Sequence, residues 1–454
     1  ESLHNDFVIT ITDKAAQNFS FICKKYYLNQ VYNELNFDID TNMCTSNTYE
    51  IVNTSVRDIV DMTSDASRYL GYNVNADMLC IPSIYIIPKF HKKPVSFRSI
   101  IASRHCTTKH VSRIVGKCLS LIQKRREAYC KQIEINTGYN LYWIINNNEY
   151  VLNTIHSLNK KNKVKSVDTF DFTTLYTNLE HNDIIENISE ILDKCMSDAY
   201  GFTVNDMDVR WINLDEHNIN DSNIITCNKL KDMVRFVVNN TYFTCGNSIF
   251  RQRIGIPMGT SCAPQLADLS LHNMEYKYMM DAMKNKRYDV CRKLSVTHRY
   301  IDDVTNFNGK GFLEKAKTDI YPPSLTLLKV NDAPSKADVL DLTIHIDENR
   351  KFVTKTYDKR RSFPFKVTNF PHIHSNVPEH LCYSVYCGQV IRHSKLNDKV
   401  EDFCHNIKLL NKTVMERGYN RRILLQKFRT LVKSSKIHIK YMCSATRIIS
   451  SIFN

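Results

Sequence analysis

The sequence predicts an α+β fold, in which helices alternate with β-hairpins that share one sheet. Over several long segments, apolar residues recur every three or four positions, as in amphipathic helices. Between these segments lie short β-rich runs bounded by turns, which is typical of hairpins. Interleaving of this kind favours helices packed on an antiparallel sheet. At 454 residues, the chain is too long for one ordinary core, so several subdomains are expected.

The individual elements follow from these periodicities. Helical spacing predicts helices at 24–35, 56–70, 109–132, 141–158, 183–196, 229–239 and 263–283, and a basic helical region from about 380 onward. β-rich runs predict strands or hairpins at 7–12, 80–88 paired with 95–102, 165–175, 242–249 and 294–308. The stretch 202–228 is polar and rich in Asn and Asp, and it predicts a loop inserted between core elements.

The composition indicates a globular, basic protein. Hydrophobic residues make up 43% and charged residues 24% of the chain, and its net charge is +14. Such an excess suits a polyanionic partner such as nucleic acid, although a basic solvated surface would give the same totals. The 15 cysteines are scattered without a zinc spacing, which favours reduced intracellular thiols.

No part of the sequence predicts a membrane segment. The most apolar stretch, 79–88, is too short to cross a bilayer and contains two prolines. No signal peptide opens the chain, so a soluble protein without a membrane partner is expected. Because the first residue is Glu and not Met, we expect the sequence to be a piece of a longer product.

Two groups of carboxylates carry the main chemical signal. Asp302 and Asp303 follow Tyr300-Ile301, and Asp171 lies upstream between two phenylalanines. Adjacent acids are common on solvated loops, but the apolar flanks of Asp171 predict a buried position, where an unpartnered carboxylate is costly. Hard oxygen ligands suit Mg²⁺, and a pair of metal ions is a known solution for nucleotidyl transfer. Because side chains alternate along a strand, we expect Asp302 to face Asp171 and Asp303 to lie more peripherally.

A glycine-containing loop precedes the helix predicted at 263–283. It reads Gly255-Ile256-Pro257-Met258-Gly259. Two glycines around a proline permit an unusual turn or a close approach of the backbone to a ligand. A plain loop before a helix is the alternative interpretation.

Three further side chains are candidates for nucleotide binding. Lys89 and Arg98 lie on the basic hairpin near residues 89–98, and such cations can hold a triphosphate, arginine through a bidentate fork. A solvated basic turn is the alternative. Tyr176, five residues after Asp171, could stack against a sugar, whereas a core tyrosine is the alternative.

Taken together, these motifs resemble the reverse transcriptase family over most of the chain. The basic hairpin, the Asp171 strand, the Gly255–Gly259 loop with its helix and the Tyr300–Asp303 hairpin come in the family's order. A later segment, Val339–Ile344, looks like the one that leads to the primer grip. Within the family, the segments Pro88–Lys92, Leu175–Asn178 and Gly255–Gly259 look most like those of Penelope-like retroelements, which are relatives of telomerase. Met258, where many reverse transcriptases have Gln, is usual in that branch.

The resemblance implies a role for each motif. Asp171, Asp302 and Asp303 would be the catalytic aspartates, and the metal ligands would be Asp171, Asp302 and the backbone carbonyl of Phe172. The nucleotide-binding set would be Lys89, Arg98, Tyr176 as a sugar gate, Gly255, Pro257, Met258 and Gly259. The cofactor would be two Mg²⁺ ions, with Mn²⁺ as a substitute, and the partners would be an RNA template, a DNA or RNA primer and dNTPs.

The resemblance also implies a right-hand polymerase architecture. Its parts would be an N-terminal extension (1–78), fingers (79–165), a palm (166–370, with the inserted loop 202–228 and a primer-grip region at 325–370) and a helical thumb (371–454). Basic thumb residues would hold a duplex backbone: Arg392, Lys395, Arg417, Arg421, Arg422, Lys427 and Arg429.

The expected function is therefore that of an RNA-directed DNA polymerase of a retroelement, acting in the nucleus at the site of integration. Two alternatives remain open at this point. One is a domesticated remnant that binds nucleic acid without catalysis, against which the intact aspartates argue. The other is an RNA-dependent RNA polymerase, in which a residue at the position of Tyr176 would have to admit a 2′-hydroxyl.

Overall fold

The computed structural model describes residues 3–72, 80–205, 208–214, 224–434, 436–437 and 445–453. The chain divides into two compact units. The N-terminal unit comprises residues 1–13, 19–146 and 170–329, and the C-terminal unit comprises 14–18, 147–169 and 330–454. Both units mix helices and antiparallel strands, so the predicted mixture of helix and sheet is confirmed.

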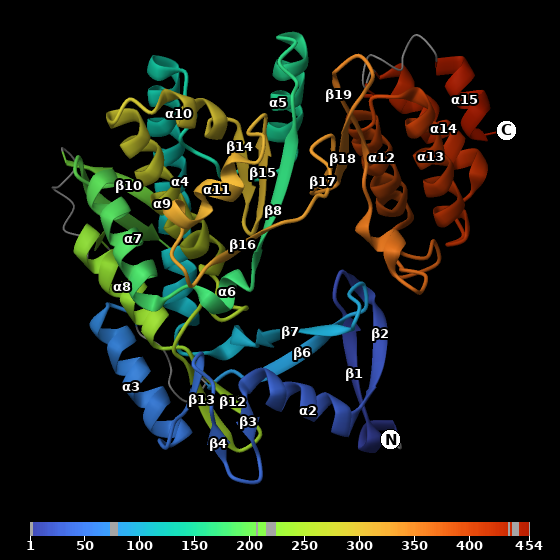
Figure 1. Ribbon diagram of the computed structural model, residues 1–454. Helices are drawn as coiled ribbons and strands as arrows, with labels where there is room; N and C mark the ends of the chain where they lie inside the picture. Colours follow the sequence, from blue (N-terminus) through green and yellow to red (C-terminus); the bar gives the residue numbers. More distant parts are fainter. Residues whose placement is uncertain are drawn as a thin grey trace. The chain divides into compact units, whose positions relative to one another are not determined.

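A four-stranded sheet in the N-terminal unit carries the predicted aspartates (Figure 1). Its strand order is β14 (Thr297–Tyr300), β15 (Asp303–Phe307), β8 (Val167–Thr173) and β16 (Thr326–Lys329). β14 and β15 form the predicted hairpin, in which Tyr300 pairs with Asp303. The hairpin loop is therefore only the two residues Ile301 and Asp302.

Four helices build the core beside this sheet: α4 (Lys109–Thr137), α7 (His181–Cys195), α8 (Cys227–Asn239) and α9 (Ala263–Lys284). α7 packs against α8 and α9, and α4 also contacts both of these helices. Local residues set the ends of these helices. α4 ends before Gly138, which has the left-handed conformation. At the start of α8, the Thr226 hydroxyl accepts a hydrogen bond from the Lys229 amide. α10 (Tyr288–Leu294) and α11 (Phe312–Ile320) flank β14 and β15 in the chain.

Smaller hairpins and sheets complete the N-terminal unit. The predicted basic hairpin is present as β6 (Ile84–Lys89) and β7 (Ser96–Ile101). β12 (Tyr242–Cys245) and β13 (Ser248–Gln252) pair as predicted, and β5 (Tyr49–Ile51) adds to them. The remaining elements are α1 (Leu3–Asp6), β1 (Phe7–Thr12), β2 (Ala15–Cys23), α2 (Lys24–Leu35), β3 (Phe37–Asp38), β4 (Met43–Cys44), α3 (Val56–Tyr69), a short 3₁₀ turn (Ser103–His105) and α6 (Leu175–Asn178).

The prediction of a loop at 202–228 is wrong for the residues that the structure describes there. β9 (Ala199–Asn205) lies between β10 (Asp208–Asn213) and β11 (Ile224–Ile225) in a three-stranded sheet. Apolar residues at alternate positions anchor it, since the rings of Phe202 and Trp211 lie 4.3 Å apart. The surrounding Asn and Asp residues hid this alternation. Residues 206–207 and 215–223 lie outside the described part.

The helix predicted at 141–158 begins eight residues later than expected. The segment before it is extended, because its backbone bonds to β14: the Arg299 amide donates to the Trp143 carbonyl (2.6 Å), and the Ile145 amide donates to the Arg299 carbonyl (2.9 Å). Trp143 is fully buried there. Tertiary pairing with a strand thus overrides the helical spacing of the apolar residues.

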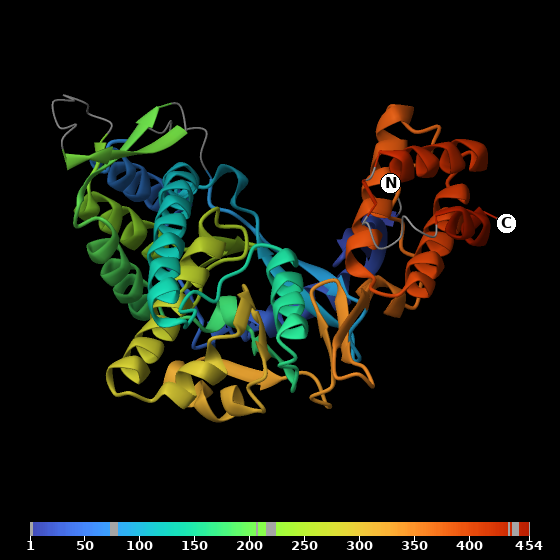
Figure 2. The same ribbon diagram turned by 90° about the horizontal axis from the view of Figure 1, so that it is seen from above.

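The C-terminal unit combines a three-stranded sheet with helices (Figure 2). The strands are β17 (Lys336–Val339), β18 (Leu342–Ile346) and β19 (Phe352–Thr356), in that order. The helices are α5 (Glu149–Lys160), α12 (Glu379–Leu396), α13 (Val400–Met415), α14 (Arg421–Lys433) and α15 (Ala445–Phe453), with a 3₁₀ turn at Lys359–Ser362. Its own apolar core includes Tyr386, Phe403 and Phe428, so the predicted helical C-terminal region is confirmed. In the described residues of either unit, no helix combines the length and the apolar character that crossing a membrane requires.

Candidate active site

The three predicted catalytic aspartates converge on one point of the four-stranded sheet. Asp171 lies on β8, Asp302 lies in the β14–β15 loop and Asp303 begins β15. One carboxylate oxygen of each lies within 4.8 Å of the other two. At an effective dielectric of about 20, each ionised pair at this separation repels by about 3.5 kcal/mol. A bound cation would relieve that repulsion, and an all-carboxylate donor set suits Mg²⁺.

The tight turn between the strands brings Asp303 into the cluster. Ile301 has φ of +57°, which is unusual for a β-branched residue. This turn removes the alternation that would otherwise direct the two adjacent carboxylates to opposite faces. The Asp303 carboxylate thus lies within reach of the other two, and its side chain is more exposed than that of Asp302, which agrees with the expectation that Asp303 is the more peripheral of the two. The Asp302 carbonyl accepts a hydrogen bond from the Phe172 amide (3.0 Å), which joins the turn to β8.

A buried arginine also holds this turn in place. Arg299 on β14 has no solvent exposure. Its guanidinium donates to the Ile301 carbonyl (3.2 Å), and it pairs with Glu275 (2.6 Å) and Asp268 (2.7 Å) of α9. Burial disfavours the charged form, but the two carboxylates hold the pKa of Arg299 above its ordinary value. Arg299 therefore stays charged and fixes the strained turn onto α9.

A tyrosine completes this network. Burial and the charge of Glu275 raise the pKa of Tyr321 well above its usual range. Its phenol remains protonated and donates to Glu275 Oε1 (3.0 Å). The sequence motifs did not reveal this network. One available signal was an arginine inside a strand, and another was the seven-residue spacing of Asp268 and Glu275, which places them on one face of a helix.

The predicted Gly255–Gly259 loop is held by backbone contacts on two sides. At one end, the Ile256 amide donates to the Tyr176 carbonyl (2.7 Å), and at the other the Ile101 amide donates to the Met258 carbonyl (3.0 Å). Both glycines have positive φ, and a Cβ at Gly255 would overlap the Tyr176 carbonyl oxygen. Glycine is therefore required there for backbone packing. The loop connects the residue expected to be the sugar gate with the end of the basic hairpin.

Tyr176 lies close to the aspartate cluster. It lies on α6, directly after β8, and is half-buried. Burial, followed by the charges of Asp268 and Asp302, raises its pKa above the ordinary value, so the phenol is neutral. The structure thus brings Tyr176 into the electrostatic neighbourhood of Asp302.

The two predicted triphosphate ligands lie on adjacent strands of the basic hairpin. Lys89 ends β6, and Arg98 on β7 pairs with Ile87. Arg98 Nε lies 3.5 Å from Asp13 Oδ1. Burial and the charge of Arg98 lower the pKa of Lys89. An anion that bound Arg98 would have to compete with the nearby Asp13 carboxylate.

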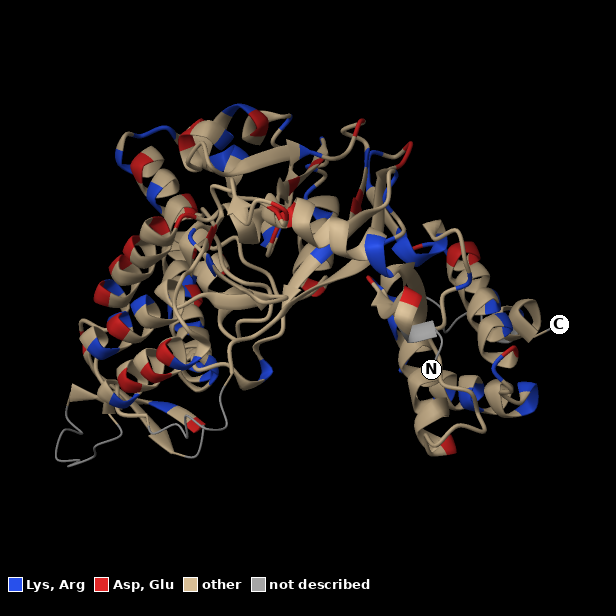
Figure 3. Cartoon of the chain, turned by 90° about the horizontal axis from the view of Figure 1, so that it is seen from below, with Lys and Arg blue, Asp and Glu red and all other residues tan. Residues whose placement is uncertain are grey.

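Several of the expected duplex-binding residues are engaged within the C-terminal unit. Arg392 pairs with Asp341 (2.7 Å) and Lys395 pairs with Glu149 (3.2 Å). Arg417 donates to the Phe370 carbonyl (3.1 Å). Figure 3 shows acidic residues interspersed among the basic ones on these helices. Basic residues that we expected to bind a duplex backbone therefore also make contacts that stabilise the C-terminal unit itself.

The fold is similar to that of telomerase. Telomerase from Candida albicans, in complex with the TWJ fragment of telomeric RNA, matches with a TM-score of 0.62 and 11% identity, over 99% of this chain and 71% of that one. Apo telomerase from Candida tropicalis matches with a TM-score of 0.51 and 14% identity, over 99% of this chain and 73% of that one. No protein family model and no curated protein sequence matches the chain.

At such low identity the similarity establishes the fold alone. The chain thus has a fold similar to that of telomerase. The expected likeness in fold is confirmed as a similarity to telomerase, whereas membership of the reverse transcriptase family and of its Penelope-like branch stays a prediction.

Proposed function

We propose that the chain is an RNA-directed DNA polymerase of a retroelement, of the Penelope-like branch, which extends a primer with dNTPs on an RNA template in the nucleus. The observation that carries the proposal is the convergence of Asp171, Asp302 and Asp303 within 4.8 Å, in a fold similar to telomerase. In this proposal the right-hand subdomains follow the boundaries expected from the sequence.

The three aspartates would hold two Mg²⁺ ions, assisted by the backbone carbonyl of Phe172. The bound ions would stabilise the charge that develops on the transferred phosphoryl group and on the attacking 3′-hydroxyl. The protein's own contribution is to fix the carboxylates before substrate arrives. Arg299 provides this by holding the Ile301 carbonyl while Glu275 and Asp268 hold its guanidinium. Arg299 is thus a positioning residue in this proposal.

Around the cluster, the remaining predicted residues would bind the nucleotide. Tyr176 would contact the sugar, and the Gly255–Gly259 loop, including Pro257 and Met258, would form the floor beneath the base and template. Lys89 and Arg98 would contact the triphosphate. The electrostatic effect of Asp302 on Tyr176 and the hydrogen bond that joins the loop to Tyr176 support the first two roles.

Primer extension by the purified chain tests the proposal. The substrate is oligo(dT) annealed to poly(rA) with Mg²⁺, and dTTP is compared with UTP. We expect extension with dTTP and much less with UTP. No extension with either nucleotide, together with tight binding of the hybrid, would identify a binding protein, and equal use of UTP would favour an RNA polymerase.

A further inference from the structure

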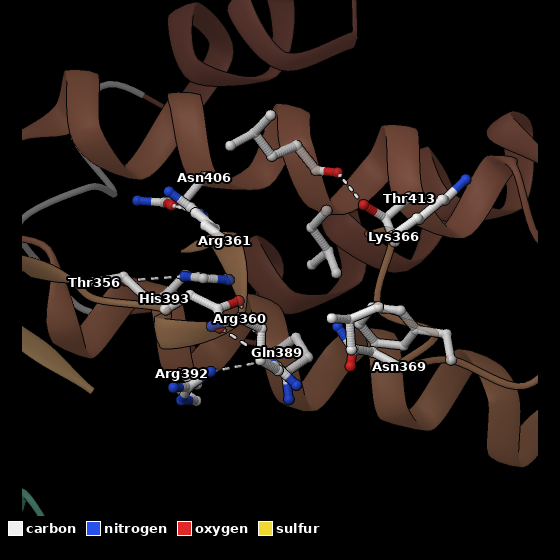
Figure 4. A pocket seen from close by; sticks show the side chains of 15 residues that line it. Thr356, Arg360, Arg361, Lys366, Asn369, Gln389, Arg392, His393, Asn406 and Thr413 are labelled. Carbon is white, nitrogen blue, oxygen red and sulfur yellow. Dashed lines mark hydrogen bonds and ion pairs between the residues drawn. The ribbon is translucent and has the colours of Figure 1, made fainter. Parts of the chain in front are cut away.

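A cavity of about 300 Å³ with both polar and apolar walls lies in the C-terminal unit, within a region that no catalytic role uses (Figure 4). Its walls come from the end of β19, the 3₁₀ turn at 359–362, the segment 366–370 and the helices α12 and α13. Four cationic side chains line it: Arg360, Arg361, Lys366 and Arg392. Its volume is at the small end of ligand pockets in proteins, so it suits a compact group.

Three of these cations have a carboxylate partner. Arg360 pairs with Asp358 (2.8 Å), Arg392 pairs with Asp341 and Lys366 pairs with Glu416. Such pairs hold the cationic side chains in place and leave little excess charge. The fourth cation is the exception.

Arg361 has no carboxylate within ion-pairing distance among the described residues. Its guanidinium donates to the neutral amide oxygen of Asn406 (2.7 Å). The orientation of that amide is settled, because Asn406 Nδ2 donates to the Asp402 carbonyl (2.8 Å) and to Asn397 Oδ1 (3.1 Å). A guanidinium has five N–H donors in a fixed fork, so Arg361 keeps donors for a ligand, while the charge of Asp358, which also lines the cavity, offsets part of its own.

A buried histidine offers a second donor. His393 is 8% exposed, and burial, together with the charges of Arg392 and Arg361, lowers its pKa to about 4. Its ring is therefore neutral near pH 7. The Thr356 hydroxyl oxygen accepts a hydrogen bond from Asn397 Nδ2 (2.9 Å) and lies 3.0 Å from His393 Nδ1.

One arrangement of these contacts makes the ring a donor at Nε2. When the Thr356 hydroxyl donates to His393 Nδ1, the neutral ring carries its proton on Nε2 and is a donor there. The cations that lower the pKa of His393 also favour an anion in the cavity. In Figure 4 the ring of His393 is drawn between Arg361 and Arg360.

We propose that this cavity binds a phosphate monoester, with Arg361 as its main ligand and His393 as a second donor. A monoester has three terminal oxygens and nearly two negative charges near neutral pH. An internal backbone phosphate has one charge and two esterified oxygens, so it offers less to converging donors. The phosphate monoester would come from the 5′-phosphate end of a nucleic acid strand or from a free phosphate compound. This site differs from a surface that follows a duplex backbone.

Binding measurements on the full chain at about pH 7.5 test the proposal in two arms. The first compares a single-stranded oligonucleotide bearing a 5′-phosphate with the same oligonucleotide ending in a 5′-hydroxyl. The second titrates inorganic phosphate and AMP, with adenosine as the uncharged comparison. A preference in the first arm identifies a strand end as the source, and binding confined to the second arm identifies a free phosphate compound. Either result supports the site.

Arg361→Gln should remove the preference for phosphate, with a loss of at least about tenfold in affinity, as for a hydrogen bond to a charged group. Arg361→Lys should retain part of it, because it keeps the charge but not the fork. Lys433→Gln, on α14 outside the cavity, is the matched control and should change nothing.

The proposal is overturned if phosphate gives no advantage in either arm, or if Arg361→Gln binds as the wild type does. Asp302→Asn should retain the phosphate preference. The outcome is thereby separate from that of the polymerase proposal.

Discussion

Replacing Arg299 by Lys is expected to weaken both the fold and the turn that carries Asp302. In the wild type, the guanidinium makes five hydrogen bonds, to both carboxylate oxygens of Glu275, to the side chain and carbonyl of Asp268 and to the Ile301 carbonyl. An ammonium group keeps the charge but cannot span this set, because it lacks the planar fork.

The size of this destabilisation follows from the burial of the charged side chains of Arg299, Glu275 and Asp268. The side chains of Arg299 and Glu275 are fully buried, and that of Asp268 is 12% exposed. Hydrogen bonds to charged groups contribute about 1.5–3 kcal/mol each, so losing two lowers the free energy of unfolding by about 3–6 kcal/mol. Removing the charge as well, in Arg299→Met, leaves two buried carboxylates uncompensated and costs at least as much.

The assay combines urea unfolding with single-turnover primer extension. Arg287→Lys is the matched control, because Arg287 pairs with Asp281 on the surface, where an ion pair contributes about 0–1 kcal/mol. For the polymerase proposal, Arg299→Lys should lower the rate of nucleotide addition about 100-fold, as for a small misplacement of reacting groups, with unchanged hybrid binding. If Arg299→Lys destabilises the protein no more than Arg287→Lys does, the reasoning is refuted.

Three further changes have defined outcomes. Tyr176→Ala should raise the use of GTP relative to dGTP on one primed RNA template, measured as the ratio of kcat/KM values. A hydrophobic wall alone rejects an extra hydroxyl about 100-fold. An unchanged ratio would mean that Tyr176 is only a core residue. Gly255→Ala should destabilise the chain by several kcal/mol, because its Cβ would overlap the Tyr176 carbonyl. The control Gly246→Ala, at a glycine with positive φ but open space around it, should cost only about 1–2 kcal/mol. Equal effects of the two changes in urea unfolding would contradict the packing argument. Burial lowers the pKa of His298 to about 4, below its unfolded value of about 6.5. Its contribution to the free energy of unfolding is therefore complete above about pH 6.5 and falls by up to about 3 kcal/mol as pH drops to 4. His298→Gln should reduce this dependence of the unfolding free energy on pH, and an unchanged dependence would show that His298 does not contribute.

The sequence predicted the elements with regular periodicity and the residues that lie in compact motifs. The helices α4, α7 and α8 were found because their apolar spacing is regular, and α9 and the hairpin around Asp302 were found beside their motifs. The aspartate cluster was found because two of its members are adjacent and the third is flanked by phenylalanines.

The elements that were missed depend on contacts between distant segments. Trp143 lies in a segment with helical spacing, yet its carbonyl bonds to β14. Phe202 and Trp211 alternate with polar residues that hid their strands. The Arg299 network joins β14 to two positions on α9, so no single stretch of sequence contains it.

Asp302→Asn tests the central claim most directly. The change removes one charge from the aspartate cluster and keeps the size of the side chain. Asp289→Asn, which alters a carboxylate on the exposed surface of α10, is the control. The measurement is the single-turnover rate of dTTP addition to oligo(dT) on poly(rA) with Mg²⁺, together with the affinity for the hybrid. We predict that Asp302→Asn binds the hybrid at least as tightly as the wild type but extends it at less than about one hundredth of the wild-type rate, a typical loss when one electrostatic stabiliser is removed. Retention of more than about a tenth of that rate would contradict the assignment of Asp302 as a metal ligand in nucleotidyl transfer.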